Sequence, residues 1–175
     1  MKLFKSVIMV KHPRDLVWET IRDHLSEIVP YLDDIASVTT EQRAQDPDGV
    51  LQLVNLWQAD IAIPDILTSV IDTDSVSWTD HAGWHPNNHE CHWQIKPHFF
   101  SDRISCSGST HYESAIGGRG TRITFAGQFD VSAHDIPGIP AFMENSAAKV
   151  IESLVTTLIP KNFRKITDAL PMILN

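Results

Sequence analysis

Residues 138–170 of this chain decide its fold: GIPAFMENSAAKVIESLVTTLIPKNFRKITDAL. Between Phe142 and Ile159 the apolar side chains recur at steps of three and four residues, which is the period of an α-helix with one wide apolar face. Polar residues occupy most of the opposite side. The segment is too polar to span a membrane and too apolar to be stable alone. It therefore predicts a long amphipathic helix that packs on another layer.

A β-sheet is the expected second layer. Alternation with a period of two, which is typical of β-strands, is found in residues 2–10 and again from Ile35 onward. The candidate strands are 2–10, 35–44, 50–59, 66–71, 75–81, 89–96, 103–113 and 120–131. The short connections, rich in Pro, Gly, Asn and Asp, favour an antiparallel meander. Two short helices, over 14–24 and 25–32, follow the first strand, so the sequence predicts a single α+β domain over residues 1–175.

Composition and charge exclude several classes of protein. The chain has 175 residues, 42% hydrophobic and 21% charged, as in an ordinary globular domain with a sizeable core. A net charge of −8 argues against nucleic acid or an anionic membrane as partner, because both select a basic surface. Residues 1–7 show no secretion signal, so we expect a cytoplasmic protein. Cys91 and Cys106 are expected to be reduced thiols, with a cross-strand disulfide as the alternative.

The last hairpin can be predicted residue by residue. If Gly117 and Gly118 form the turn, one face carries four facing pairs: Cys106 with Phe129, Gly108 with Gly127, Thr110 with Phe125, and Tyr112 with Ile123. The side chains of the other parity are mostly polar. A facing pair of glycines in a strand marks either a bend that lets backbones pack closely or space beneath the helix. Both interpretations stay open.

Four short segments complete the pattern: HPRDLVW at 12–18, SVSW at 75–78, GTRITF at 120–125 and IPGIP at 136–140. With the order of the elements, they resemble the START-related, helix-grip superfamily (SRPBCC), which includes birch-pollen-allergen-like proteins, polyketide cyclases and lipid-transfer domains; 136–140 is similar to a bacterial branch. The resemblance implies a curved seven-stranded antiparallel sheet gripping a long C-terminal helix around an apolar cavity, with Trp18 packed under the sheet. It implies no particular reaction, because carriers, sensors and a minority of enzymes share this fold.

If such a cavity exists, its predicted wall is aromatic and apolar, and Ile95 is expected on it. The candidate ligand-binding residues are Asn55, Trp57, Trp93, Cys106, Thr110, Tyr112, Phe125 and Phe129 from the sheet, and Phe142, Met143, Val150 and Leu154 from the helix. This set suits a hydrophobic small molecule or lipid, and the alternative is a solid core. Asn55, Thr110 and Tyr112 are the polar candidates for orienting a ligand, although Tyr112 could equally lie at the rim.

Histidines are concentrated in one region, at His81, His85, His89, His92 and His98 around Cys91. Imidazole and thiolate suit zinc, but Pro86 and its neighbours prevent a helix that would align the histidines. Cys91 and His92 point to opposite faces of a strand. We expect neither a metal nor a cofactor, and interpret these residues as a polar loop at the mouth of the cavity.

Enzyme chemistry is the alternative function. A cyclase- or hydrolase-type reaction in the same cavity could use Tyr112 and a histidine of the 81–89 loop as acid and base. Asp72 and Asp74 are expected to cap a turn. Beyond Pro160, which is expected to interrupt the helix, residues 160–175 form either a second short helix or a basic docking surface. The sequence sets no oligomeric state; the main hypothesis is a carrier for a hydrophobic molecule.

Overall fold

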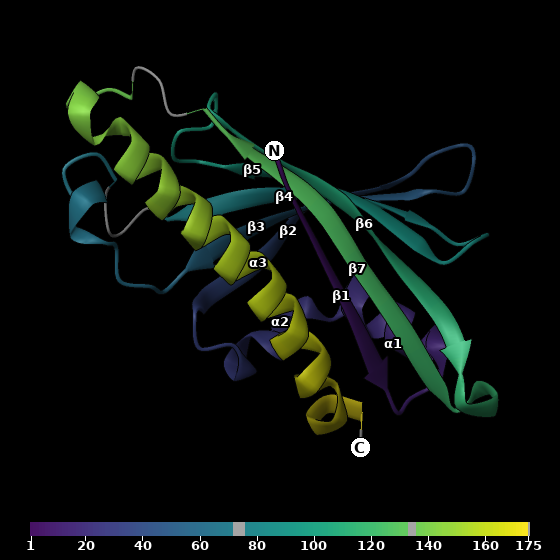
Figure 1. Ribbon diagram of the computed structural model, residues 1–175. Helices are drawn as coiled ribbons and strands as arrows, with labels where there is room; N and C mark the ends of the chain where they lie inside the picture. Colours follow the sequence, from purple (N-terminus) through teal and green to yellow (C-terminus); the bar gives the residue numbers. More distant parts are fainter. Residues whose placement is uncertain (72–75, 133–135, 175) are drawn as a thin grey trace.

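The computed structural model describes residues 1–71, 76–132 and 136–174, so the turn predicted around Asp72 and Asp74 lies outside the described residues. Seven strands of this described part form one antiparallel sheet in the order β1-β7-β6-β5-β4-β3-β2 (Figure 1). The strands are β1 (Lys2–Val10), β2 (Ile35–Gln45), β3 (Leu51–Ala59), β4 (Ser77–His85), β5 (Glu90–Pro97), β6 (Ile104–Ala115) and β7 (Gly120–Val131). The predicted α+β class and antiparallel meander are confirmed.

The strand predicted over 66–71 is wrong. Asp65–Leu67 forms a 3₁₀ turn, and the amide of Ile71 donates to the carbonyl of Leu67 at 2.8 Å. Leu67 and Ile71 are both buried. Their spacing of four residues puts them on the same side of a helical turn, whereas a strand would place its apolar residues at a spacing of two.

Two short helices follow β1, as predicted: α1 (Arg14–Asp23) and α2 (Leu25–Ile28), the latter extended by a 3₁₀ turn over Val29–Tyr31. The Thr121 hydroxyl of β7 donates to the carbonyl of His12 at 2.8 Å and holds the entry into α1. Trp18 of α1 is buried under the sheet, as the resemblance implied.

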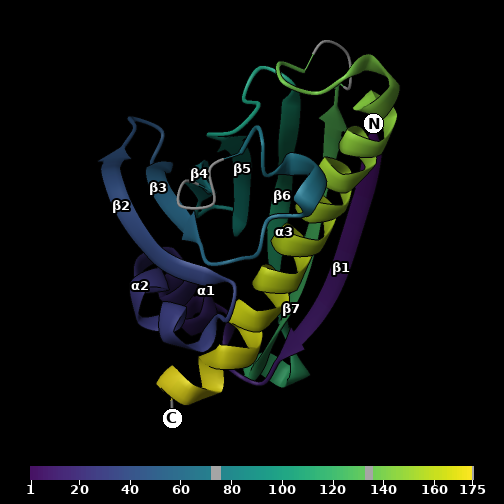
Figure 2. The same cartoon turned by 90° about the vertical axis from the view of Figure 1, so that its left-hand side faces the viewer.

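The C-terminal helix α3 (Glu144–Leu174) is longer than predicted and follows a 3₁₀ turn at Ala141–Met143. It runs through Pro160, so the predicted interruption there is wrong. Pro160 lacks an amide hydrogen, but tertiary packing on both sides of it holds the helix together. Its buried side includes Ala147, Ile151, Val155, Ile166 and Leu170. Figure 2 shows α3 crossing the concave side of the curved sheet.

Residues 160–174 are therefore part of α3, neither a second helix nor a free basic surface. Lys161 pairs with Asp34 at 3.0 Å, and Lys165 pairs with Asp33 at 3.1 Å. These ion pairs join the cationic side of the segment to the loop before β2. Among the described helices, none combines the length and apolar character needed to cross a membrane.

The predicted register of the last hairpin is confirmed, including the facing Gly108 and Gly127. A Cβ at Gly127 would lie 2.6 Å from Cη2 of Trp93, and one at Gly108 would lie 2.6 Å from its Cζ2. Both distances are far below van der Waals contact. The glycines thus make room for the Trp93 indole to lie flat on the sheet, and the space above them is filled by that ring.

Candidate functional site

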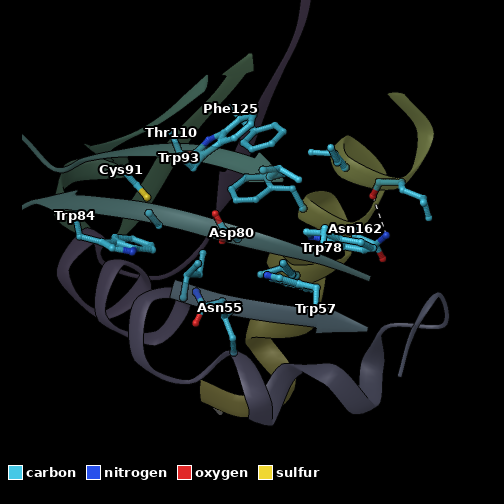
Figure 3. Close-up of a pocket in the computed structure, with 18 of the residues that line it drawn as sticks. Asn55, Trp57, Trp78, Asp80, Trp84, Cys91, Trp93, Thr110, Phe125 and Asn162 are labelled. Atoms are coloured by element: carbon cyan, nitrogen blue, oxygen red, sulfur yellow. Dashed lines mark hydrogen bonds between the residues drawn. The ribbon is translucent and has the colours of Figure 1, made fainter. Parts of the chain in front are cut away.

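A cavity of about 700 Å³, including the space at its open mouth, lies between the sheet, the first helices and α3. Strands β3 to β7 supply most of its wall. The lining residues are Ile21, Leu25, Asn55, Trp57, Trp78, Asp80, Ala82, Trp84, Cys91, Trp93, Ile95, Thr110, Tyr112, Phe125, Leu158, Ile159, Asn162, Phe163 and Ile166. The wall is overwhelmingly apolar, and Figure 3 shows how most of these side chains gather around one space.

Aromatic rings stack in layers on this wall. Trp57 and Trp78, on neighbouring strands, stack with centroids 5.9 Å apart. On the other side, Phe125 stacks on Trp93 at 5.1 Å and on Phe163 of α3 at 4.3 Å. Stacked rings of this kind are held by dispersion and offset quadrupoles, so the wall is stiff as well as apolar.

Asp80 stands in the middle of this aromatic wall. It belongs to β4, where it alternates in phase with Trp78, Ala82 and Trp84, so the pleat of the strand turns its carboxyl toward the cavity. Figure 3 shows it between Trp84 and Trp78. Asp80 as a whole is half-buried, but its Oδ1 atom is buried and has no hydrogen-bond partner among the described residues.

Burial raises the pKa of Asp80 to about 7, because an apolar surrounding disfavours the charged carboxylate. Asn55 faces Asp80 across the β3–β4 pair, and Trp57 lies two residues further along β3. Side-chain hydrogen bonding by both residues favours the charged form and lowers the pKa of Asp80, but by less than burial raises it. Asp80 therefore changes charge near neutral pH, as residues of catalytic and binding sites often do.

The other titratable groups on the wall are neutral. Burial raises the pKa of the Cys91 thiol and of the Tyr112 hydroxyl well above their ordinary values. Cys106, just outside the cavity, has its pKa raised to about 12 by burial. Both cysteines are free and buried, so the alternative prediction of a cross-strand disulfide is wrong. Neither thiol has the thiolate character of a nucleophile.

Six of the twelve candidate ligand-binding residues line the cavity: Asn55, Trp57, Trp93, Thr110, Tyr112 and Phe125; the expected Ile95 also does. Their contact with a ligand stays a prediction. Two of the polar candidates have structural partners, since Asn55 Oδ1 accepts from the Thr40 hydroxyl at 2.7 Å and Thr110 Oγ1 accepts from the Trp93 indole at 3.2 Å. Tyr112 is 1% exposed and lies against Trp18, not at a rim.

The other six candidates lie elsewhere. Cys106 lines a second, smaller apolar pocket near the end of β5, and Phe129 is buried without reaching the cavity. Met143, Val150 and Leu154 are partly buried against the core, and Phe142 is 85% exposed. The structure corrects the expected place of these six residues on the cavity wall, while their contact with a ligand stays a prediction. The four helix candidates miss the wall because the cavity lies under α3 from Leu158 onward, and all four precede Leu158.

Sequence reasoning missed Ile21, Leu25 and Cys91, and two larger parts of the wall. The first is Trp78, Asp80, Ala82 and Trp84, which the candidate strand 75–81 cut short; extending the alternation to 85 would have put Asp80 among three apolar residues. The second is the set on α3 after Leu158, above all Asn162 and Phe163. Interpreting Pro160 as a break hid these residues, although their spacing continues the apolar face of the helix.

The histidines do not form the mouth of the cavity. None of the described histidines lines it. His85 and His92 pack together on the outer face of the sheet, where Glu90 pairs with His92 at 3.0 Å. His98 hydrogen-bonds Ser77 and Thr79 instead. Within the described ranges, no three His, Cys, Asp or Glu side chains are grouped so that they could hold a metal ion.

Comparisons with known proteins identify the fold. No family model and no curated protein matches the sequence. The ZhuI aromatase/cyclase of Streptomyces sp. R1128 superposes with a TM-score of 0.69 at 15% identity, covering 99% of this chain and 96% of that one. TTHA0849 of Thermus thermophilus superposes with a TM-score of 0.59 at 16% identity, covering 96% of this chain and 99% of that one.

The di-domain aromatase/cyclase BexL of the BE-7585A biosynthetic pathway gives a TM-score of 0.64 at 11% identity; the match covers all of this chain and 48% of that one. The chain thus has a START-like, helix-grip fold, as the resemblance implied. Identities this low show the shared fold alone.

Proposed function

We propose that this protein binds a hydrophobic small molecule, with a ring system or a lipid-like chain, in the cavity between the sheet and α3. The observation that carries the proposal is the cavity itself, whose wall is almost entirely aromatic and aliphatic, as in small-molecule sites. A core that only stabilised the fold would be packed without such a space, because voids in protein interiors are costly.

The experiment compares a filled cavity with the natural one. Ala82 lies on the wall and is buried, so Ala82→Leu would add a side chain to the cavity. We expect native mass spectrometry to show retained ligand, and a hydrophobic fluorescent dye to bind, in the natural protein and much less in Ala82→Leu. Ala44→Leu, at an exposed position of β2, is the matched control and should bind normally. Equal dye binding by all three proteins, with no retained ligand, would contradict the proposal.

A cyclase-type enzyme is the second candidate, and Asp80 is the observation that favours it. A carboxylate with a pKa of about 7 can accept a proton from a carbon beside a carbonyl group, and the buried Tyr112 hydroxyl lies on the same wall. Two of the superposed structures are aromatase/cyclases. This mechanism uses Asp80 as base in place of the histidine expected from the sequence.

Deuterium exchange tests the enzyme hypothesis separately from binding. Acetonaphthone, a hydrophobic aryl ketone, is incubated with the protein in deuterated water, and loss of its methyl proton signal is followed by NMR. We expect exchange to be faster with the natural protein than with Asp80→Asn, while both bind the ketone. Equal exchange by both proteins would leave the carrier function as the better account.

A further inference from the structure

Three buried polar atoms on the cavity wall have no hydrogen-bond partner among the described residues. One is a donor, the indole nitrogen of Trp84, and two are acceptors, Oδ1 of Asp80 and Oδ1 of Asn162. Buried polar atoms in folded proteins almost always have a partner. Three unpaired atoms around one cavity indicate that its occupant is not a plain hydrocarbon but carries polar groups of its own.

Charge narrows the class of occupant. Asp80 carries the only carboxyl group on the described wall, and no lysine, arginine or histidine is among the lining residues. A buried carboxylate without a cationic partner is costly, so such groups in proteins are paired or become neutral. Because the described wall carries no cationic side chain, the cationic partner of Asp80 would come from the ligand.

The rings around Asp80 favour the same class of ligand. Trp57, Trp78 and Trp84 lie on the wall beside the carboxyl, and Trp93 lies on the neighbouring strand β5 of the same wall. The faces of indole rings carry negative charge density and attract ammonium groups, most strongly where water is excluded. The net charge of −8 additionally draws cations toward the protein.

We propose that the cavity selects a hydrophobic amine, a ligand with one ammonium group placed against Asp80 and an apolar body packed against the tryptophans. This rests on the proposed binding function and names its substrate class. A neutral alcohol of the same shape fills the same space but leaves the carboxylate without a countercharge. The amine should therefore bind more tightly than the alcohol whenever Asp80 is ionised.

The pH dependence follows from the groups that face Asp80. These are Asn55 and Trp57 from β3, with Cys91 and Cys106 near it on the following strands; both thiols are neutral at neutral pH. Protonation of Asp80 thus removes the one charge on the described wall. An alkylammonium group stays charged up to about pH 10, so the preference for the amine should be present above about pH 7 and fade below it.

Calorimetric titration with naphthylethylamine and its neutral counterpart naphthylethanol tests the proposal. At about pH 8 we expect the natural protein to bind the amine about tenfold more tightly than the alcohol, a factor worth ~1.4 kcal/mol. At about pH 5.5, and in Asp80→Asn at both pH values, the two should bind within about threefold of each other. Asp48→Asn removes the same charge from an exposed turn and should keep the preference.

The outcomes separate this inference from the function it rests on. If the natural protein binds both probes equally, the ammonium proposal is overturned while hydrophobic binding stands. A preference for the alcohol at about pH 5.5 would point to a hydroxyl ligand that pairs with protonated Asp80, and would also overturn it. If neither probe binds, both proposals fail. If Asp80→Asn still preferred the amine over the alcohol, the tryptophans alone would account for the preference, and the proposed role of the Asp80 carboxyl would be wrong.

Discussion

The ring of Phe163 in α3 stacks on that of Phe125 in β7, with centroids 4.3 Å apart and planes inclined by 9°. Trp93 of β5 also stacks on Phe125, with centroids 5.1 Å apart. Through these three rings the helix is fastened to the sheet at the wall of the cavity. Phe163 is only partly buried, so its contribution is concentrated in this contact.

Phe163→Ala should lower the free energy of unfolding by about 2 kcal/mol, less than a fully buried phenylalanine, because the stack is lost and the cavity widens. Urea denaturation followed by circular dichroism measures the change. Phe142→Ala is the control, since Phe142 is 85% exposed and its removal should alter stability by less than about 0.5 kcal/mol. Equal losses in the two variants would contradict the importance of the stack.

Gly127→Ala should destabilise the protein by about 1–3 kcal/mol, because the new methyl group would overlap the Trp93 ring and lie 2.8 Å from the Ser107 carbonyl oxygen. Gly83→Ala is the matched control in another strand. There the nearest atoms are 3.3 Å and 3.4 Å away, in the flexible side chain of Gln52, which can move aside. Thermal denaturation compares the two, and a larger loss at Gly83 would refute the account of the glycine pair.

Asp80→Asn should stabilise the protein at about pH 8 and leave its stability almost unchanged near pH 4. The pKa of Asp80 rises from 3.8 to about 7 on folding, so the folded state keeps a proton that the unfolded state loses between these values. The contribution of Asp80 to the free energy of unfolding therefore falls as the pH rises from 3.8 to about 7, and stays low above about pH 7. The full penalty is at most about 4 kcal/mol, and smaller to the extent that water reaches the carboxyl.

Denaturant titrations at several pH values measure the difference in free energy of unfolding between the natural protein and Asp80→Asn. Titration of the histidines affects both proteins equally, so it does not contribute to this difference. The stability gap between Asp80→Asn and the natural protein should widen steadily from about pH 4 to about pH 7. A gap that does not depend on pH would mean that Asp80 has an ordinary pKa.

Removal of the residues after Ile159 should abolish the fold. The deleted part contains Ile166 and Leu170, both buried, and the Lys161 and Lys165 partners of Asp34 and Asp33. Loss of two large buried side chains alone costs several kcal/mol, which is comparable to the whole stability of a domain. A truncated protein with dispersed NMR amide signals would show instead that this segment is dispensable for folding.

The fold was predictable because its signals are periodic and local. The register of β6 and β7 followed from one glycine turn, and the amphipathic pattern located α3. The continuation of α3 through Pro160 was not predictable, because packing of Ile166 and Leu170 outweighs the local cost of the proline. For the same reason, the part of α3 after Pro160, which helps to cover the cavity, was predicted as a separate segment.

The centre of the site was harder to predict than the fold. Asp80 directly precedes His81 in β4. The predicted strand ended at residue 81, four residues before the end of β4, and this concealed which face of the sheet Asp80 occupies. The aromatic wall was visible as alternation, so Trp57, Trp93 and Phe125 were placed near one another. The pKa of Asp80 depends on burial by residues from several strands, which no single segment of sequence displays.

Strand β1 pairs with β7, so Val10 lies beside Thr121, more than one hundred residues later in the chain. A ribosome must therefore add all of the intervening strands, β2 to β6, before β1 gains its neighbour. Until then its edge offers unpaired amides and carbonyls to any other extended chain. Contacts so distant in sequence slow folding, and we expect newly made chains to need protection from chaperones during that interval.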